Sequence, residues 1–443
     1  MTTSALQGSR VVGVRPLVRW LLFVICAAVF FVLAYSSATT WGEVQEGLQA
    51  GFAGQLDSME QGNESGNRNR QAAGIALGLL GTSALVSKRG VARLRPMGAL
   101  GWLLTAYIAL YFLSIGWADE PQLTMRRVAA FGMMALAVGG LVRLLPAEDM
   151  VSFALFAATV YLLIALAAEC FTGSLHPFAP DYRFSGVFHP NTVGSLCAIL
   201  LSAAASTDWQ RARRWRIGAA TSIGVAVLLL TRSRASLLGL LAALAVRWMV
   251  AARRSQKCIA LAVGAWILCA ACVAAGDAIG PAIETAVSMA RADSDVGTLG
   301  GRTDLWEELL RYIGQRPVLG YGLGGFWGAR HVREIYLSQR WPVAEAHSTY
   351  VEQLLDVGAI GLGLYIAVMA GALWRATLRL KASHDGVHGF MVCVLVYFLV
   401  AGFFETMQPN PSLPTFLLFW TLGHLAFRAT PAPVAPRSPC VST

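Results

Sequence analysis

The chain alternates long apolar segments with short segments that contain most of its basic residues. Apolar residues make up 56% of the 443 residues and charged residues only 14%, whereas soluble proteins carry about 25% charged residues. A membrane-spanning helix needs about 20 mainly apolar residues, and twelve segments of this chain reach or approach that length. The sequence therefore predicts an all-α, polytopic membrane protein.

The predicted spans are separated by short polar segments, with one long polar interval before the last three. The boundaries near 72–86 and within 217–251 are the least defined, because the segments there are short. The first span follows three arginines and resembles a signal peptide, but we expect it to stay uncleaved, because the parity of the later spans requires it. The spans lie at residues 17–35, 72–86, 97–117, 128–146, 150–170, 186–206, 217–231, 235–251, 258–276, 348–374, 387–407 and 414–428.

This pattern divides the chain into four parts. Residues 1–276 hold spans one to nine, 277–347 form a large outward loop with short amphipathic helices, 348–428 hold spans ten to twelve, and 429–443 form a Pro-rich tail that we expect to be disordered. Segments predicted to face the cytoplasm carry 21 basic residues, and outward segments carry 14. Because basic residues favour the cytoplasmic side, both termini are predicted to be cytoplasmic. Orientation, and not nucleic-acid binding, explains the net charge of +10.

The eight cysteines are predicted to be structural. Most of them lie inside apolar segments, and the pair Cys269 and Cys272 matches a C-x-x-C spacing in the middle of a predicted helix. Cysteines in such surroundings behave as small buried apolar residues more often than as a redox or metal-binding pair. We expect no disulfide.

The long loop contains an amphipathic segment followed by a glycine-rich one. Asp304 and Glu307 have the spacing of a capping box, and apolar residues then recur at helical spacing from Leu305 to Ile313. This predicts a helix that lies on the membrane surface or packs the loop onto the spans. The segment 320–325 satisfies G-x-G-x-x-G, but no strand precedes it, so we expect a tight turn and not a dinucleotide site.

Arginines on the outward side run against the orientation rule and are candidates for function. Arg232 and Arg234 lie between two apolar segments with almost no loop, and ionisable groups so close to the membrane are functional candidates by default. The alternative is that they extend to lipid headgroups. Together with Arg183 and Arg302 they could bind a diphosphate, because each guanidinium can bind phosphate oxygens bidentately.

Two histidines precede predicted helix starts on the outward side. His347 comes just before a Thr349–Glu352 capping box, where the helix dipole disfavours the imidazolium form. A neutral imidazole there could act as a general base, although a lone histidine is more often structural. His189 and Asn191 flank a proline that suits a first helical turn, so they either cap that helix or contact a ligand. Arginines beside a base suit glycosyl transfer from a lipid diphosphate.

Four ordered motifs resemble the O-antigen ligase and O-antigen polymerase superfamily of membrane glycosyltransferases. They are TRSRAS at 231–236, GRTDLW at 301–306, RPVLGYGLGGFW at 316–327 and AHSTYVEQLLDVGAIGL at 346–362. The GYGLGGFW segment and the Phe404-Glu405-Thr406 triplet are most similar to its exopolysaccharide-polymerase branch.

The resemblance implies a twelve-span bacterial inner-membrane enzyme with a periplasmic loop, no metal and no cofactor. It implies a donor glycan carried on undecaprenyl diphosphate, with Arg234 and Arg302 holding the diphosphate and His347 activating the acceptor hydroxyl. Many relatives have Asn after this His, whereas this chain has Ser348.

Three alternatives stay open at this stage. Within the family, the acceptor is either a growing exopolysaccharide or O-antigen chain, or the lipid A–core of a ligase reaction. From other classes, a lipid or solute transporter would place its charges inside broken mid-membrane helices. A scaffold would act on other polysaccharide-assembly proteins and would not need His347. We find no internal repeat that favours a transporter.

Overall fold

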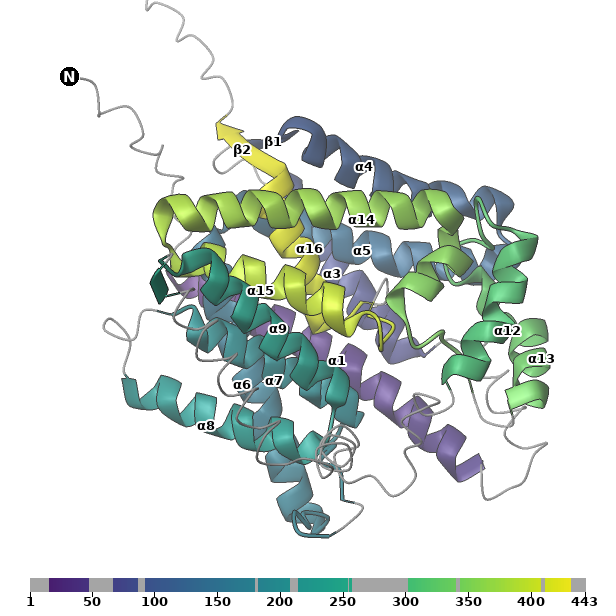
Figure 1. The fold of residues 1–443 in the computed structure, drawn as a ribbon, viewed down its shortest axis with the longest axis horizontal. Helices are drawn as coiled ribbons and strands as arrows, with labels where there is room; N and C mark the ends of the chain where they lie inside the picture. Colours follow the sequence, from purple (N-terminus) through teal and green to yellow (C-terminus); the bar gives the residue numbers. More distant parts are fainter. Residues whose placement is uncertain are drawn as a thin grey trace, which may run out of the picture.

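The computed structural model is a bundle of helices with a small helical region at one end (Figure 1). It describes residues 16–47, 67–86, 92–179, 182–207, 214–253, 255–256, 302–339, 343–407 and 411–431. The predicted ninth span, the predicted Cys269–Cys272 pair and the start of the predicted loop lie outside these residues.

A helix occupies each of the other eleven predicted spans, so the helical membrane fold is confirmed within the described residues. Six helices are long and apolar enough to cross a membrane, and three more are apolar but shorter, so the count of twelve stays a prediction. The helices are α1 (Pro16–Gly47), α3 (Arg68–Val86), α4 (Gly98–Leu113) with η1 (Ser114–Trp117), α5 (Pro121–Leu144), α6 (Ala147–Thr172), α7 (Pro190–Ala205), α8 (Arg214–Thr231), α9 (Arg234–Ala251), α14 (Thr349–Ser383), α15 (Gly386–Ala401) and α16 (Leu413–Ala426).

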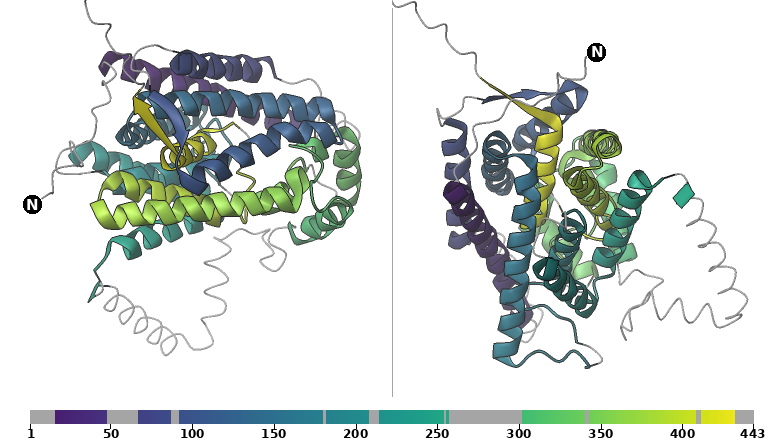
Figure 2. Two further views of the ribbon diagram at one scale, coloured as in Figure 1. Left: turned by 90° about the horizontal axis from the view of Figure 1, so that it is seen from above. Right: turned by 90° about the vertical axis from the view of Figure 1, so that its left-hand side faces the viewer.

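The three shorter helices α7, α15 and α16 form the centre of the bundle, and most of their side chains are buried. Helices of 14 to 16 residues span about 21–24 Å, less than a hydrocarbon core of about 30 Å. The longer α5, α6 and α14 surround them, together with α4 and η1 (Figure 2). This arrangement lets polar loops at the ends of the central helices lie between longer neighbours.

A two-stranded antiparallel sheet departs from the all-α prediction. Strand β1 (Ala92–Pro96) pairs with β2 (Phe427–Pro431), and the Met97 amide donates to the Ala426 carbonyl at 2.8 Å. The pairing joins the segment before α4 to the segment after α16. It includes residues 429–431, which were expected to belong to the disordered tail, and the rest of that tail is outside the described residues.

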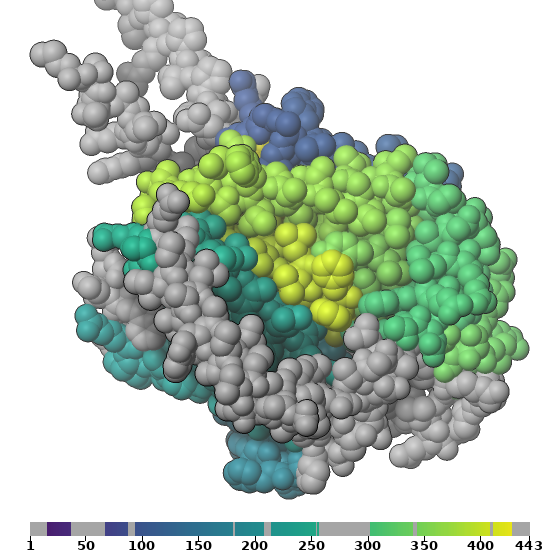
Figure 3. All heavy atoms as spheres, viewed as in Figure 1, coloured from purple at the N-terminus to yellow at the C-terminus, as the bar shows by residue number. Residues whose placement is uncertain are grey.

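The helical region at the end of the bundle consists of α12 (Arg302–Gln315), η3 (Gly325–Trp327) and α13 (Ala329–Gln339). The predicted amphipathic helix is confirmed, but it begins at Arg302, so Asp304 lies in its first turn and does not cap it. Leu305, Leu309 and Ile313 are buried in a cluster with aromatic residues of the glycine-rich turn and with α14. The apolar face therefore packs the region onto the bundle. Figure 3 shows this region, in green, beside the light green of α14.

The glycine-rich turn lies against α14 and requires its glycines. Gly320, Gly322 and Gly324 have φ values of 65°, 87° and 62°, a left-handed conformation that favours glycine. The turn fits into a break in α14 at Gly358 (φ 65°, ψ −163°), which corrects the prediction of one continuous span at 348–374. Backbone groups freed by the break are satisfied by the turn: Tyr321 N donates to Leu355 O (2.7 Å), Gly322 N to Asp356 O (2.9 Å), and Ala359 N to Pro317 O (2.8 Å).

Candidate active site

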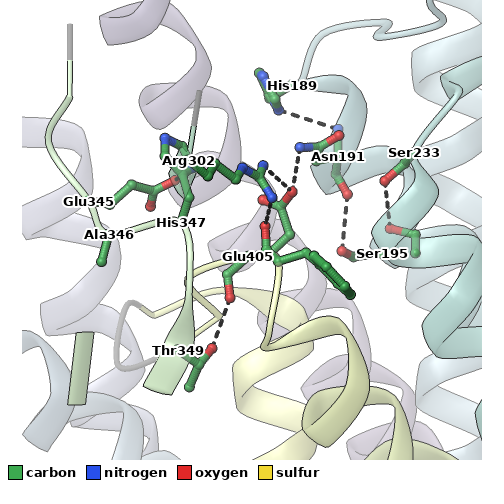
Figure 4. A network of polar contacts seen from close by, with 12 residues as sticks. His189, Asn191, Ser195, Ser233, Arg302, Glu345, Ala346, His347, Thr349 and Glu405 are labelled. Carbon is green, nitrogen blue, oxygen red and sulfur yellow. Dashed lines mark hydrogen bonds and ion pairs between the residues drawn. The ribbon is translucent and has the colours of Figure 1, made fainter. Parts of the chain in front are cut away.

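Helices α7, α9, α12, α14 and α16 all begin close together, at the end of the bundle that carries α12 and α13 (Figure 1). A helix N-terminus presents free N–H groups and a partial positive charge, so it favours anions. The loop that joins α15 to α16 lies among these N-termini and contains Glu405. Side chains of α7, α12 and α14 form one polar network with this loop (Figure 4).

Glu405 is the centre of this network. Its Oε1 accepts hydrogen bonds from Asn191 Nδ2 at 2.7 Å and from Arg302 Nη2 at 3.2 Å. Arg302 also donates to the Phe404 carbonyl, and Thr349 Oγ1 donates to the Glu405 carbonyl at 2.9 Å. The Arg302 and Glu405 side chains are only 21% and 19% exposed, so this ion pair is largely withdrawn from water. Burial raises the pKa of Glu405, although the charges of Arg302 and His347 partly offset this effect.

Arg183 enters the network from the other side. Its Nη2 donates to Asn191 Oδ1 at 3.1 Å and its Nε to the Thr231 carbonyl at 3.1 Å. Asn191 therefore links Arg183 to Glu405, and through Glu405 to Arg302. The pKa of Arg183 is lowered by burial, raised again in part by Glu405, and lowered by the charges of Arg232 and Arg234.

The structure thus brings together the four arginines predicted to bind a diphosphate. Arg234 is the first residue of α9 and lies near enough to Arg302 for the two charges to repel each other. Arg232, between α8 and α9, has a φ of 49°. Such left-handed backbone costs a non-glycine residue of the order of 1–3 kcal/mol and gathers at functional sites. A cluster of like charges beside helix N-termini favours an anion.

His347 lies beside Arg302 and forms an ion pair with Glu345 (Figure 4). Its Nδ1 is 3.1 Å from Glu345 Oε1, and the two side chains are 17% and 30% exposed. Burial lowers the pKa of His347, but the hydrogen bond and charge of Glu345 and the charge of Glu405 raise it above the ordinary value. The helix dipole alone predicted a more acidic imidazole, and the neighbouring carboxylates overturn that expectation. His347 also has a left-handed φ of 50°.

The predicted Thr349–Glu352 capping box is wrong. Ser348 is the N-cap of α14, so Thr349 is its first residue and directs its hydroxyl to Glu405. Glu352 instead accepts from Ala346 N at 2.8 Å and from Trp327 Nε1 at 2.7 Å.

The predicted cap at α7 is confirmed. His189 is the N-cap, its Nδ1 accepts from Asn191 N at 3.3 Å, and Pro190 occupies the first turn. The imidazole is exposed at the edge of the network, and Asn191 is the residue that enters it.

Sequence reasoning missed Glu345 and the central position of Glu405. Glu345 is two residues from the candidate base, and an acid at that spacing in an outward segment was a usable signal. Glu405 was noted only as part of a family motif. Its position could have been argued from charge, because an acid that follows a span on the arginine-rich side needs a partner.

A comparison with known protein families matches the part of the chain that carries several of these residues. Residues 219–366 match the family model described as O-Antigen ligase. Arg232, Arg234, Arg302 and His347 all lie inside the matched region. Over about a third of its length, the chain is similar to the O-antigen ligase and O-antigen polymerase superfamily. Arg183, Asn191 and Glu405 lie outside the matched region, so the fold and not the family model joins them to the site.

A curated relative supports the exopolysaccharide branch. The exopolysaccharide production protein ExoQ of Rhizobium meliloti (strain 1021) is 29% identical over 136 residues. The match covers 29% of this chain and 31% of that relative. Family model and relative together show that parts of the chain are similar to O-antigen ligase and exopolysaccharide production proteins. A transporter would place its charges in mid-membrane, whereas Arg234 and His347 share one site at the end of the bundle.

Proposed function

We propose that this protein transfers a glycan from undecaprenyl diphosphate to a saccharide hydroxyl at the periplasmic face of the bacterial inner membrane, and that it polymerises exopolysaccharide repeats. Both termini are then cytoplasmic, with twelve spans. The observation that carries the proposal is the placement of His347, with its carboxylate partner Glu345, beside an arginine cluster built on helix N-termini.

The arginines bind the donor. Arg302, Arg234, Arg232 and Arg183 would hold the diphosphate oxygens, with the N-termini of α7, α9 and α14 adding partial positive charge. In the transfer, the bond between the sugar carbon and the phosphate oxygen breaks and its electron pair stays on the diphosphate. Guanidinium groups placed beforehand around the leaving oxygens stabilise this developing charge, which is the usual source of the largest catalytic effect. They supply the charge for which other enzymes use a metal ion.

His347 acts on the acceptor. Its imidazole takes the proton of the attacking hydroxyl as the new glycosidic bond forms, and general base catalysis of this kind contributes about 10²- to 10⁴-fold. Glu345 orients the ring and stabilises the imidazolium that results. Glu405 and Asn191 fix Arg302 and Arg183 relative to each other.

The runner-up is a ligase that moves a finished glycan to lipid A–core, and the description of the matching family favours it. The two reactions use the same donor chemistry and differ in the acceptor. Deletion of the gene distinguishes them: loss of polymer length indicates a polymerase, and full-length polymer that stays unattached indicates a ligase.

The test of the mechanism is to replace His347 or Arg302 by alanine in cells and to measure polymer and membrane-inserted protein together. We expect no polymer at normal protein level from either variant. Arg311→Ala is the matched control, because Arg311 lies on the same helix as Arg302 in an exposed pair with Glu307, and it should keep wild-type polymer. Normal polymer from His347→Ala would exclude the proposed base.

A further inference from the structure

The first segment of α14, Thr349–Val357, carries a buried carboxylate that the proposed chemistry does not use. Glu352 is 3% exposed, and both of its oxygens are occupied. Oε1 accepts from the Trp327 indole at 2.7 Å, and Oε2 accepts from the Ala346 amide at 2.8 Å. Glu352 therefore joins α14 to two other segments, the glycine-rich turn and the segment just before α14.

The glycine-rich turn is itself fixed by buried contacts. Trp327 is fully buried in the aromatic cluster with Phe326. The turn is also bonded to α14 at the Gly358 break, and Gly324 N donates to Asp356 Oδ1 at 2.6 Å. The turn and the first segment of α14 are thus bonded firmly to each other. A hydrogen bond from Glu352, which lies in this segment, therefore restrains the backbone group that donates it.

The Ala346 peptide is what Glu352 holds. Ala346 lies between Glu345 and His347 and is fully buried. Its N–H donates to Glu352, while its carbonyl accepts from the Trp306 indole at 2.8 Å. The next residue, His347, has the left-handed φ of 50°, which persists only where surrounding contacts enforce it. The 3.1 Å contact between Glu345 and His347 spans this same peptide.

We infer that Glu352 is a positioning residue of the active site: its two hydrogen bonds fix the Ala346 peptide and thereby hold Glu345 and His347 in contact. This inference rests on the proposed function for its catalytic consequence, but its structural part is independent of it. Hydrogen bonds from N–H donors to a carboxylate are among the stronger ones. A misplacement of about 1 Å at a catalytic group can lower the rate about 100-fold.

The test uses Glu352→Gln, which keeps the size of the side chain but can accept at only one end. Its NH₂ group must face either the Ala346 or the Trp327 N–H, so one contact is lost. The readout is the pKa of His347, measured by NMR titration of protein labelled on its seven histidines and assigned by the signal lost in His347→Gln. The charged and titratable groups near His347 are Glu345, Glu405, Arg302 and His189.

We expect Glu352→Gln to lower the pKa of His347, because a displaced Glu345 no longer stabilises the imidazolium. The rate of polymer formation in membranes of the source strain should fall by about 10- to 100-fold. The acidic limb of the pH profile of this rate should move to lower pH. Adding Trp327→Phe removes the facing indole donor, so the amide oxygen can accept from Ala346, and the pKa of His347 should return toward the wild-type value.

Asp356→Asn is the matched control. Asp356 is a buried carboxylate one turn further along α14, and its Oδ1 accepts only from Gly324 among the described residues. Asn keeps that acceptor, so the pKa of His347 should not change. If Glu352→Gln does not accumulate, Glu352→Asp, which is one methylene too short to hold both donors, replaces it with the same expectation.

An unchanged His347 pKa in the Glu352 variant, or an equal shift in Asp356→Asn, would overturn the inference. A failure of the proposed function would give a different result. In that case His347→Ala would still form polymer, and Glu352→Gln would still shift the pKa of His347.

Discussion

Replacing Glu345 by glutamine tests the most specific part of the site, the ion pair that sets the protonation of His347. In the folded protein the carboxylate raises the pKa of His347 above its ordinary value of 6.5. A general base must be unprotonated, so wild-type activity should rise with pH as His347 loses its proton. Glu345→Gln removes the charge that favours the imidazolium, so the acidic limb should move to lower pH.

The maximal rate should fall at the same time. The contact between Glu345 and His347 is 3.1 Å long and mostly shielded from water, and a hydrogen bond to a charged group contributes about 1.5–3 kcal/mol. This bond strengthens as the imidazolium forms in the transition state, so its loss corresponds to roughly a 10- to 150-fold lower rate. The amide oxygen of glutamine can still accept from the ring, which favours the lower end.

The pair also makes stability depend on pH. His347 has a raised pKa when folded, so its contribution is complete at low pH and is lost as the pH rises through that value. Burial raises the pKa of Glu345, but its hydrogen bond to His347 and the nearby positive charges lower it below its ordinary value of 4.5. Its contribution therefore appears above that ordinary value and is lost as the pH falls through the lowered one. Both contributions are present between about pH 4.5 and 6.5, so Glu345→Gln should lower the melting temperature most in this window.

The assay is the initial rate of polymer formation in membranes between about pH 5 and 9, normalised to protein level, with thermal unfolding of purified protein measured alongside. Glu307→Gln is the control, because it makes the same charge change in an exposed pair on α12. If the acidic limb of Glu345→Gln stays in place or moves to higher pH, His347 is not a base assisted by Glu345.

Two further predictions concern the arginine cluster and the glycine-rich turn. Arg183→Lys replaces a two-pronged donor by a single ammonium that cannot reach both Asn191 and the Thr231 carbonyl, so the KM for the lipid-linked donor should rise about tenfold at unchanged protein level; an unchanged KM would separate Arg183 from donor binding. Gly324→Ala should lower the free energy of unfolding by about 1–3 kcal/mol, because φ is +62° and a β-carbon would overlap the Arg127 side chain. Gly314→Ala, with open space around it, should be neutral or slightly stabilising in the same thermal unfolding experiment, and equal losses from both would contradict the steric reasoning.

Local sequence patterns correctly predicted most of the helices that carry the site. Apolar segments of membrane length identified the helices, and the periodic stripe from Leu305 to Ile313 identified α12, because burial in these elements follows directly from side-chain periodicity. The proline after His189 correctly placed the start of α7. Arginines on the outward side pointed to Arg183, Arg234 and Arg302, because the orientation rule leaves such charges unexplained.

What the sequence could not supply were contacts between distant segments. Glu405 meets Asn191 and Arg302 only because the loops after α15 and before α7 come together in the fold. The apolar sequence around Gly358 does not predict the break there, because the partners of the freed backbone groups come from the glycine-rich turn. The same limit applies to His347. A helix start predicts a lowered pKa, and a carboxylate 3.1 Å away reverses the direction.

Charge balance ties these residues to the proposed reaction. The four guanidinium groups of Arg183, Arg232, Arg234 and Arg302, set against the carboxylates of Glu345 and Glu405, leave two net positive charges when His347 is neutral. A diphosphate that bridges a lipid and a sugar carries one negative charge on each phosphate, so the two match. Transfer of the sugar leaves one more negative charge on the diphosphate, and in the same step His347 gains a proton. The site therefore keeps its balance of charge from donor to product without exchanging an ion with water.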